Sequence, residues 1–196
     1  MPSAADIVRH CDPDPDEDPW VDGPPPPVDV RLVAYDPAWP DRFRILADDV
    51  RDALGDGVLE LRHVGSTAVP GLAAKDVIDI DLVVADPRDE DAYVPALTAR
   101  GWRHVVREPS WHEHRCLRHA APAANLHVFG PDCPEVIRHR MFRDWLREHP
   151  DDRRLYEQAK RDAVPGGGTV MDYNARKQEV IRAVYDRIFR AAGLLP

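Results

Sequence analysis

The feature that most constrains the fold is the segment at residues 77–84, Val-Ile-Asp-Ile-Asp-Leu-Val-Val. It is rich in β-branched side chains and is followed by Asp86-Pro87, so it predicts a strand. Residues two apart on a strand point to the same face with Cα atoms about 6.5 Å apart, so Asp79 and Asp81 lie side by side. Two such carboxylates on a buried face need a counter-charge. The segment therefore predicts a strand that carries a charged site.

A divalent cation is the simplest counter-charge, because Mg²⁺ favours one or two carboxylates together with phosphate oxygens. We therefore predict a Mg²⁺ site at Asp79 and Asp81. The alternative is that both carboxylates face solvent on an edge strand, where each contributes little to stability.

A second polar segment precedes this strand, because Gly65-Ser66 follows a predicted strand at residues 58–64. A glycine there lets the backbone turn close to a ligand, and a serine offers its hydroxyl and amide to a phosphate. Lys75 lies shortly before the acid pair, where its charge suits a phosphate or Asp79. We predict nucleotide phosphates at Gly65, Ser66, Thr67 and Lys75. For the Gly-Ser pair taken alone, an ordinary turn is the alternative.

The remaining pattern predicts an α/β (α+β) fold, with an antiparallel or mixed sheet, flanking helices and a helical C-terminal part. Helices are predicted near 43–54 and 91–100, ending at Gly55 and Gly101, and helical structure follows Pro134, with a break at 165–168. A turn is predicted at 35–40. The other predicted strands lie at 30–34, 103–106, 114–118 and 125–129.

Basic residues of the helical part are candidates for the same pocket. Tyr156 and Lys160, and likewise Tyr173 and Lys177, are four residues apart and share a helical face. Such a pair could stack a base on the ring and bind a phosphate with the lysine. Arg143 is a similar candidate. The alternatives are a solvated helix face for each lysine and a salt bridge to a nearby acid for Arg143.

The stretch at 63–75, His-Val-Gly-Ser-Thr-Ala-Val-Pro-Gly-Leu-Ala-Ala-Lys, followed by Val-Ile-Asp-Ile, resembles the signature of the GrpB family (UPF0157-type). Further similar segments lie in the same order at 35–40, 125–128, 142–147, 156–160 and 173–177. The resemblance covers roughly residues 30–189. It implies the nucleotidyltransferase fold, in which a serine turn holds a triphosphate and paired acids hold the metal. Family members occur alone or fused after dephospho-CoA kinase, where the domain has been viewed as an accessory to folding.

One position departs from the wider superfamily, in which a third carboxylate usually lies on a later strand. The corresponding triplet here is Leu126-His127-Val128, and His127 could ligate a metal, contact a phosphate or be a buried structural histidine. The resemblance implies transfer of a nucleotidyl group from a nucleoside triphosphate with Mg²⁺ to a small-molecule acceptor, with Asp79, Asp81 and His127 catalytic. The absent acid favours the alternative, a non-catalytic domain that binds a nucleotide or a partner protein or assists folding.

Residues 1–27 are acidic and proline-rich, so we predict a disordered or extended tail ahead of a domain at 28–191, with Trp20 undocked. The formal net charge of -9 argues against broad nucleic-acid or anionic-membrane binding, but not against a small basic pocket. No apolar run of about 18 residues and no export signal is visible, which predicts a cytoplasmic protein. The alternation of His112, His114 and Cys116 fits no common zinc pattern and predicts a histidine-rich surface strand.

Overall fold

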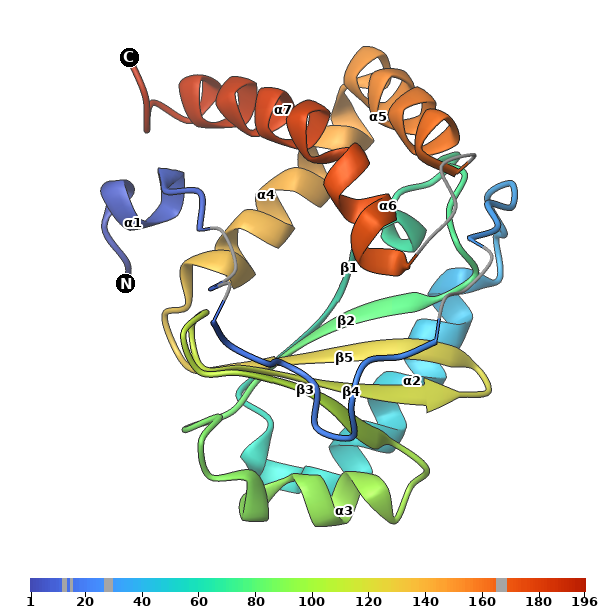
Figure 1. The fold of residues 1–196 in the computed structure, drawn as a ribbon, viewed down its shortest axis with the longest axis vertical. Helices are drawn as coiled ribbons and strands as arrows, with labels where there is room; N and C mark the ends of the chain where they lie inside the picture. The colour runs from blue at the N-terminus through green and yellow to red at the C-terminus, as the bar shows by residue number, and fades with distance from the viewer. Residues whose placement is uncertain (12–13, 15, 27–29, 165–168) are drawn as a thin grey trace.

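The computed structural model describes residues 1–11, 14, 16–26, 30–164 and 169–196. Its centre is a five-stranded sheet in the order β1-β2-β5-β4-β3. The β2 and β5 strands pair in parallel, whereas the other neighbours are antiparallel. The predicted mixed sheet with flanking helices and a helical C-terminal part is confirmed (Figure 1). The strands are β1 (Glu60–Val64), β2 (Ile78–Val83), β3 (Arg103–Glu108), β4 (His114–Ala120) and β5 (Ala123–Phe129).

One face of the sheet is apolar and forms the main core. Ile78, Ile80 and Leu82 alternate with the two acids of β2 and are fully buried. They pack against α2 (Trp39–Leu54) and α3 (Val94–Thr98), which lie on the same side of the sheet (Figure 1). Each large apolar side chain that is fully buried stabilises the fold by about 1.5–3 kcal/mol. The alternation therefore fixes which face the acids occupy.

The helical C-terminal part covers the opposite, polar face of the sheet. Its helices are α4 (Pro134–Glu148), α5 (Pro150–Ala163), α6 (Val170–Arg176) and α7 (Gln178–Ala191). The helices α4, α5 and α7 share a second apolar cluster that includes Val69 and Leu72 from the loop before β2 and Leu146, Val184 and Phe189 from the helices. This packing holds the helices over the side of the sheet that carries Asp79 and Asp81 (Figure 1).

Several element boundaries differ from the prediction. The strand predicted at residues 30–34 is wrong, because only Val33 pairs, through a single bridge to Ala74. The α2 helix begins at Trp39, inside the predicted turn, because Pro40 is acceptable in the first turn of a helix. The helix predicted at 91–100 is divided between the 3₁₀ turn η3 (Glu90–Ala92) and α3. Short 3₁₀ turns also lie at η1 (Gly55–Gly57) and η2 (Ser66–Ala68). The break predicted at 165–168 lies outside the described residues.

The first residues of the chain form the helix α1 (Ala4–Val8), where a disordered or extended segment is predicted. Ile7 and Val8 pack against the apolar cluster of the C-terminal helices. The guanidinium of Arg138 on α4 is buried and donates to the carbonyls of Ile7 and Arg9 at 2.9 and 2.7 Å. The segment as a whole is acidic, so its composition did not indicate that these few apolar side chains give the helix a face that packs on the domain.

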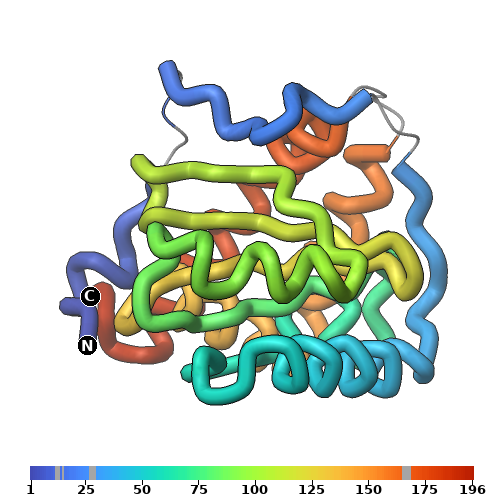
Figure 2. Tube along the Cα trace, turned by 90° about the horizontal axis from the view of Figure 1, so that it is seen from below, coloured from blue at the N-terminus to red at the C-terminus, as the bar shows by residue number. Residues whose placement is uncertain are grey.

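The expectation that Trp20 stays undocked is wrong. Trp20 pairs with Val106 and packs against Val105, Val106 and Cys116. The N–H of Arg107 donates to the carbonyl of Pro19 at 2.8 Å, so the segment runs along β3 (Figure 2). The reason is that β3 is an edge strand, and its free backbone groups need partners.

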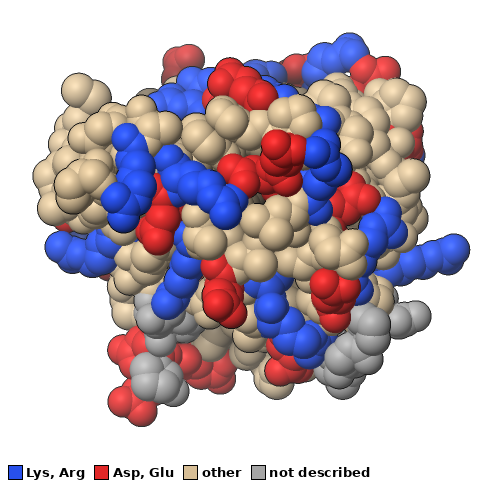
Figure 3. Space-filling view, turned by 90° about the horizontal axis from the view of Figure 1, so that it is seen from above, with Lys and Arg blue, Asp and Glu red and all other residues tan. Residues whose placement is uncertain are grey.

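The helices at the top of Figure 1 present a surface of mixed charge. Figure 3 shows basic and acidic side chains interleaved over this face. Many of them form ion pairs, such as Arg161 with Glu157 and Arg187 with Asp152. Within the described residues, no helix combines the length and the apolar character needed to cross a membrane.

Candidate functional site

The two acids of β2 share one face of the sheet, as predicted, but their surroundings differ. In the parallel pairing, Asp79 lies opposite Asn125 and Asp81 opposite His127. The side chain of Asp79 is 31% exposed, whereas that of Asp81 is 1% exposed. The alternative of two solvent-facing acids on an edge strand is wrong, because β2 lies between β1 and β5.

The counter-charge of Asp81 is a histidine from the helical part. Nδ1 of His139 on α4 lies 3.0 and 3.1 Å from the two carboxylate oxygens of Asp81. Burial opposes a charge on His139, but the carboxylates of Asp81, Glu135 and Asp79 together outweigh it and raise the pKa of His139 to about 9. At neutral pH this is therefore a buried ion pair between a carboxylate and an imidazolium.

The carboxylate of Asp79 faces the turn that precedes it in the sequence. Its Oδ1 accepts a hydrogen bond of 2.8 Å from the Asn125 amide and lies 3.9 Å from Nε2 of His127. Burial opposes the ionised form, but the contacts with His127 and Asn125 keep the pKa of Asp79 below its usual value. A Cβ on Gly65 would lie 2.4 Å from Oδ2 of Asp79, and its φ of +66° also favours glycine. Only glycine allows the turn to approach this closely.

Three lysines converge next to this turn, and we call Lys75, Lys160 and Lys177 the lysine cluster. Lys160 is 2% exposed, and its Nζ donates to the hydroxyl of Ser66 at 3.2 Å and to the carbonyl of Ala73. Its Nζ also lies 4.9 Å from the centre of the Tyr156 ring. The Nζ of Lys75 lies 5.5 Å from the centre of the Tyr173 ring.

Lys177 joins the two halves of the cluster. Its Nζ lies 5.7 Å from the centre of the Tyr156 ring and 5.3 Å from that of Tyr173. Both rings are buried, and their faces attract the ammonium groups. In this arrangement the lysines lie over the ring faces, and base stacking by these tyrosines stays a prediction.

The lysine cluster holds every lysine of the chain, three among 26 lysines and arginines. Burial and the nearby charge of Lys177 lower the pKa of Lys160 to about 7. Burial likewise lowers the pKa of Lys75, although Asp79 acts in the opposite direction. In the part of the chain that the structure describes, no ion pair joins a cluster lysine to a carboxylate. The ammonium group of a lysine is more compact than the guanidinium of an arginine, so it fits a narrow site that a guanidinium does not. The cluster is therefore a concentration of positive charge beside Ser66.

Two further residues predicted to bind the nucleotide, Thr67 and Arg143, contact His63, just before the Gly65-Ser66 turn. The side chain of Thr67 is buried, and its hydroxyl lies 3.0 Å from Nε2 of His63. Arg143 donates to the carboxylate of Asp144 and, at 2.9 Å, to the carbonyl of His63. The salt bridge considered as the alternative for Arg143 is thus the one that the structure contains.

His127 takes part in a hydrogen-bonded line that the sequence did not reveal. Its Nδ1 lies 3.0 Å from Nε2 of His114, whose Nδ1 lies 2.7 Å from Oε2 of Glu108. The prediction of a histidine-rich surface strand is wrong, because His114 and Cys116 are buried and His112 lies in a turn.

The acid pair, as arranged, does not fit the predicted Mg²⁺. Asp81 is paired with His139, and the ionised form of Asp79 is stabilised first by His127, then by Asn125 and the charge of Lys75. The residues that the structure describes include no group of three or more His, Cys, Asp or Glu side chains that could hold a metal ion. Side chains of the protein itself, rather than a metal ion, thus provide the counter-charges of the two carboxylates.

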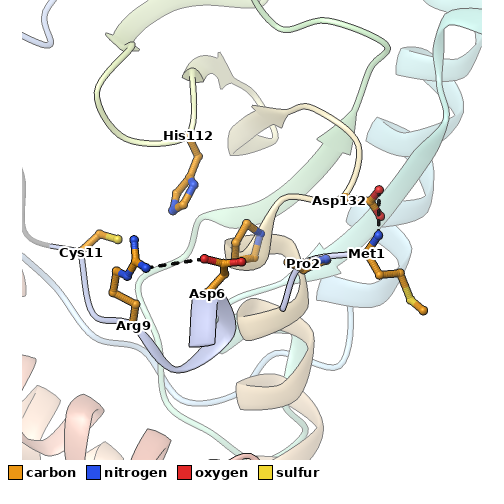
Figure 4. A pocket seen from close by; sticks show the side chains of 8 residues that line it. Met1, Pro2, Asp6, Arg9, Cys11, His112 and Asp132 are labelled. Atoms are coloured by element: carbon orange, nitrogen blue, oxygen red, sulfur yellow. Dashed lines mark ion pairs between the residues drawn. The ribbon is translucent and has the colours of Figure 1, made fainter. Parts of the chain in front are cut away.

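A separate cavity of about 390 Å³ lies at the N-terminal helix, and neither the acid pair nor the lysine cluster lines it. Figure 4 shows His112, Asp6, Arg9 and Asp132 around it. Its charges are paired, Arg9 with Asp6 at 3.7 Å and the N-terminal amine with Asp132 at 3.2 Å. We assign no ligand to it.

Comparison with known proteins places the fold and then the family. The crystal structure of the conserved protein GrpB from Enterococcus faecalis superposes with a TM-score of 0.62 at 25% identity, over 79% of this chain and 99% of that one. A family model described as GrpB protein matches residues 29–187. The chain belongs to the GrpB family.

Relatives of the family occur as separate proteins and as parts of larger ones. A UPF0157 protein of Halalkalibacterium halodurans is 42% identical over 159 residues, which cover 81% of this chain and 82% of the relative. A UPF0157 protein of Streptomyces coelicolor is 39% identical over 166 residues, covering 84% and 87%. A dephospho-CoA kinase of Mycolicibacterium paratuberculosis is 33% identical over 186 residues, covering 81% of this chain but 46% of the kinase.

Proposed function

We propose that this protein binds a nucleotide through its phosphates, at the Gly65-Ser66 turn and the lysine cluster. The observation that carries the proposal is the convergence of all three lysines at one site. Lys160 is buried there, and among the described residues no carboxylate forms an ion pair with it. A buried ammonium group without a counter-ion is costly, and a bound phosphate offsets that cost.

The groups around Ser66 suit a phosphate in kind as well as in charge. The Ser66 hydroxyl already accepts from Lys160 and is partly exposed, so it remains available to a ligand oxygen. Hydrogen bonds between ammonium groups and phosphate oxygens are charge-assisted and therefore strong. Lys75 and Lys177 are half-buried, so a ligand can contact their ammonium groups as well.

The dephospho-CoA kinases among the relatives suggest which ligands to test first. ATP and dephospho-CoA both carry an adenine nucleotide, and this chain is similar to part of such kinases. The domain would then act as a nucleotide-binding unit that responds to these molecules or presents them to a partner protein.

Nucleotidyl transfer to a small-molecule acceptor is the second candidate function. The partly exposed carboxylate of Asp79 next to the turn favours it. The two candidates differ in their need for Mg²⁺, because binding by lysines requires none, whereas the predicted transfer requires a metal at both acids.

A thermal-shift titration tests the proposal, with ATP, CTP, GTP, UTP and dephospho-CoA in the presence of Mg²⁺ or EDTA. A ligand that binds only the native state raises the melting temperature. We expect a rise in EDTA for the wild type and for Asp79→Asn, and none for Lys177→Met. Arg161→Met, which removes a surface ion pair with Glu157, is the matched control and should respond like the wild type. The absence of any shift in the wild type would refute the proposal. A shift that needs Mg²⁺ and is lost in Asp79→Asn would favour transfer.

A further inference from the structure

Lys160 is buried in the lysine cluster among uncharged partners. Its side chain is 2% exposed. Its Nζ contacts the hydroxyl of Ser66, the carbonyl of Ala73 and the face of the Tyr156 ring. An ammonium group that leaves water for such surroundings is destabilised unless a negative charge lies next to it. The position therefore disfavours a charged lysine as long as the site is empty of an anion.

The charges around Lys160 do not compensate for its burial. The carboxylate of Glu157, one turn earlier on α5, is paired with Arg161 and accepts from the N–H of Ala73 at 3.2 Å. Lys177 lies over the same tyrosine ring as Lys160 and adds a like charge. The titratable and charged groups of the surrounding elements are Tyr156, Glu157 and Arg161 on α5, Tyr173 on α6, Lys177 before α7, Lys75 and Asp79 before and on β2, and Arg118 on β4.

We propose that Lys160 takes up a proton from solvent when a phosphate binds at the lysine cluster, so that the affinity for nucleotides falls as the pH rises. The inference rests on the proposed function and concerns the regulation of that same site. An anion bound at the hydroxyl of Ser66 lies close to the amine, because Oγ and Nζ are 3.2 Å apart. Its negative charge is the counter-charge that the buried amine lacks.

The titration of Lys160 agrees with this geometry. Burial and then the charge of Lys177 lower the pKa of Lys160 from 10.5 to about 7, although Glu157 acts in the opposite direction. Above pH 7 most of the unliganded protein therefore carries a neutral amine at this position. A bound phosphate raises the pKa of Lys160 again, because an opposite charge favours the ammonium form.

The contacts of Nζ accommodate both protonation states. A neutral amine has two hydrogens and one lone pair, so it can donate to the carbonyl of Ala73 and accept from the hydroxyl of Ser66. An ammonium group has three hydrogens and donates to both oxygens. The hydroxyl of Ser66 is then free to donate its own hydrogen to a phosphate oxygen. Protonation of Lys160 thus changes Ser66 into a donor for the ligand.

Isothermal titration calorimetry with ATP in EDTA measures the proton uptake, because the heat of binding in HEPES and in Tris differs by the ionisation heat of the buffer. At pH 8 the phosphates of ATP are already ionised, since the last pKa of a phosphate is about 6. With a pKa of about 7 in the unliganded protein, Lys160 should take up about 0.9 protons per ATP at pH 8. The same linkage makes Kd about eightfold weaker at pH 8.5 than at pH 7.5.

Lys160→Met removes the titrating amine and leaves Lys75 and Lys177 to contact the phosphate. We expect its binding of ATP to take up almost no proton and to keep the same Kd at pH 7.5 and pH 8.5. Arg44→Met on α2 is the matched control and should take up as many protons as the wild type. If Lys160→Met does not fold or does not bind, the proton uptake and the pH dependence of the wild type decide.

Binding of ATP by the wild type without proton uptake and with the same Kd at both pH values would overturn the inference and leave the proposed function intact. Uptake that persists in Lys160→Met would overturn it too, because another group would then be the one that titrates. The absence of any binding by the wild type, at pH 7 as well, would refute the proposed function itself. The two failures are therefore distinguishable.

Discussion

Replacing Lys160 with methionine tests how the buried ammonium group is held. Methionine has a similar length, removes the charge and retains the apolar stem. Burial and Lys177 lower the pKa of Lys160 from its ordinary 10.5 to about 7 in the folded protein. The unfolded chain therefore binds more protons at this position between these two values. The contribution of Lys160 to the free energy of unfolding therefore rises with pH across that window. This contribution is lowest below pH 7.

The magnitude follows from the two pKa values. A difference of one pH unit between them corresponds to about 1.4 kcal/mol. Because Lys160 is half-titrated near pH 7, we expect its contribution to rise by roughly 1.5 kcal/mol between pH 7 and pH 8.5. That window stops below the range in which the buried cysteines matter, since burial raises the pKa of Cys133 to about 11. The difference between wild type and variant isolates this lysine from other titrating groups.

The free energy of unfolding of both proteins is measured at pH 7 and pH 8.5 by urea unfolding, with the fluorescence of the five tryptophans as the signal. Lys160→Met should be the more stable protein relative to the wild type at pH 7, and this advantage should shrink by pH 8.5. Arg44→Met, which removes an exposed arginine of α2 on the other side of the sheet, is the control and should retain the pH dependence of the wild type. Equal pH dependence in the wild type and Lys160→Met would refute the reasoning.

Three other substitutions test the surroundings of the site and the docking of the N-terminal segment, each by urea unfolding. Gly65→Ala would place a Cβ 2.4 Å from Oδ2 of Asp79, and we expect a loss of about 1–3 kcal/mol; a stability equal to that of the wild type would contradict the close approach. His139→Gln leaves the carboxylate of Asp81 buried without a charge partner, so we expect a loss of about 3–5 kcal/mol, and a neutral effect would show that the pair is not ionised. Trp20→Ala should cost about 1 kcal/mol or more through lost contact with Val106, whereas no change would indicate that the N-terminal segment does not dock in solution.

The sequence predicted the centre of the fold because its pattern there is local. The alternation in β2 places Ile80 in the core and Asp79 on the other face, and Gly55 ends α2 with a φ of +53°. The strand predicted around Val33 failed because β-branched composition alone does not supply a pairing partner. Trp20 was assigned to solvent because an acidic, proline-rich segment gives no sign of the free edge strand on which it packs.

The site was predicted in part for the same reason. The motif spacing brought Gly65, Ser66 and Asp79 together, because a strand and a turn fix their separation. His139 was missed because it lies 58 residues after Asp81, and nothing in the sequence of α4 marks it as a counter-charge. Asn125 and Glu108 were missed because their roles depend on strand register, which alternation does not specify. The sequence shows that the chain has three lysines, but it does not show that they converge beside Ser66.

The measurement that tests the central claim most directly is NMR of protein labelled at the lysine side chains. The chain has three lysines, so three ε-methylene signals report on the whole lysine cluster. ATP and dephospho-CoA are titrated in EDTA, with adenosine as the ligand that lacks phosphate. The account predicts that all three signals shift and saturate together with either phosphate-bearing ligand and stay in place with adenosine. Signals that do not move with any nucleotide, or that move equally with adenosine, would contradict a phosphate site at the lysine cluster.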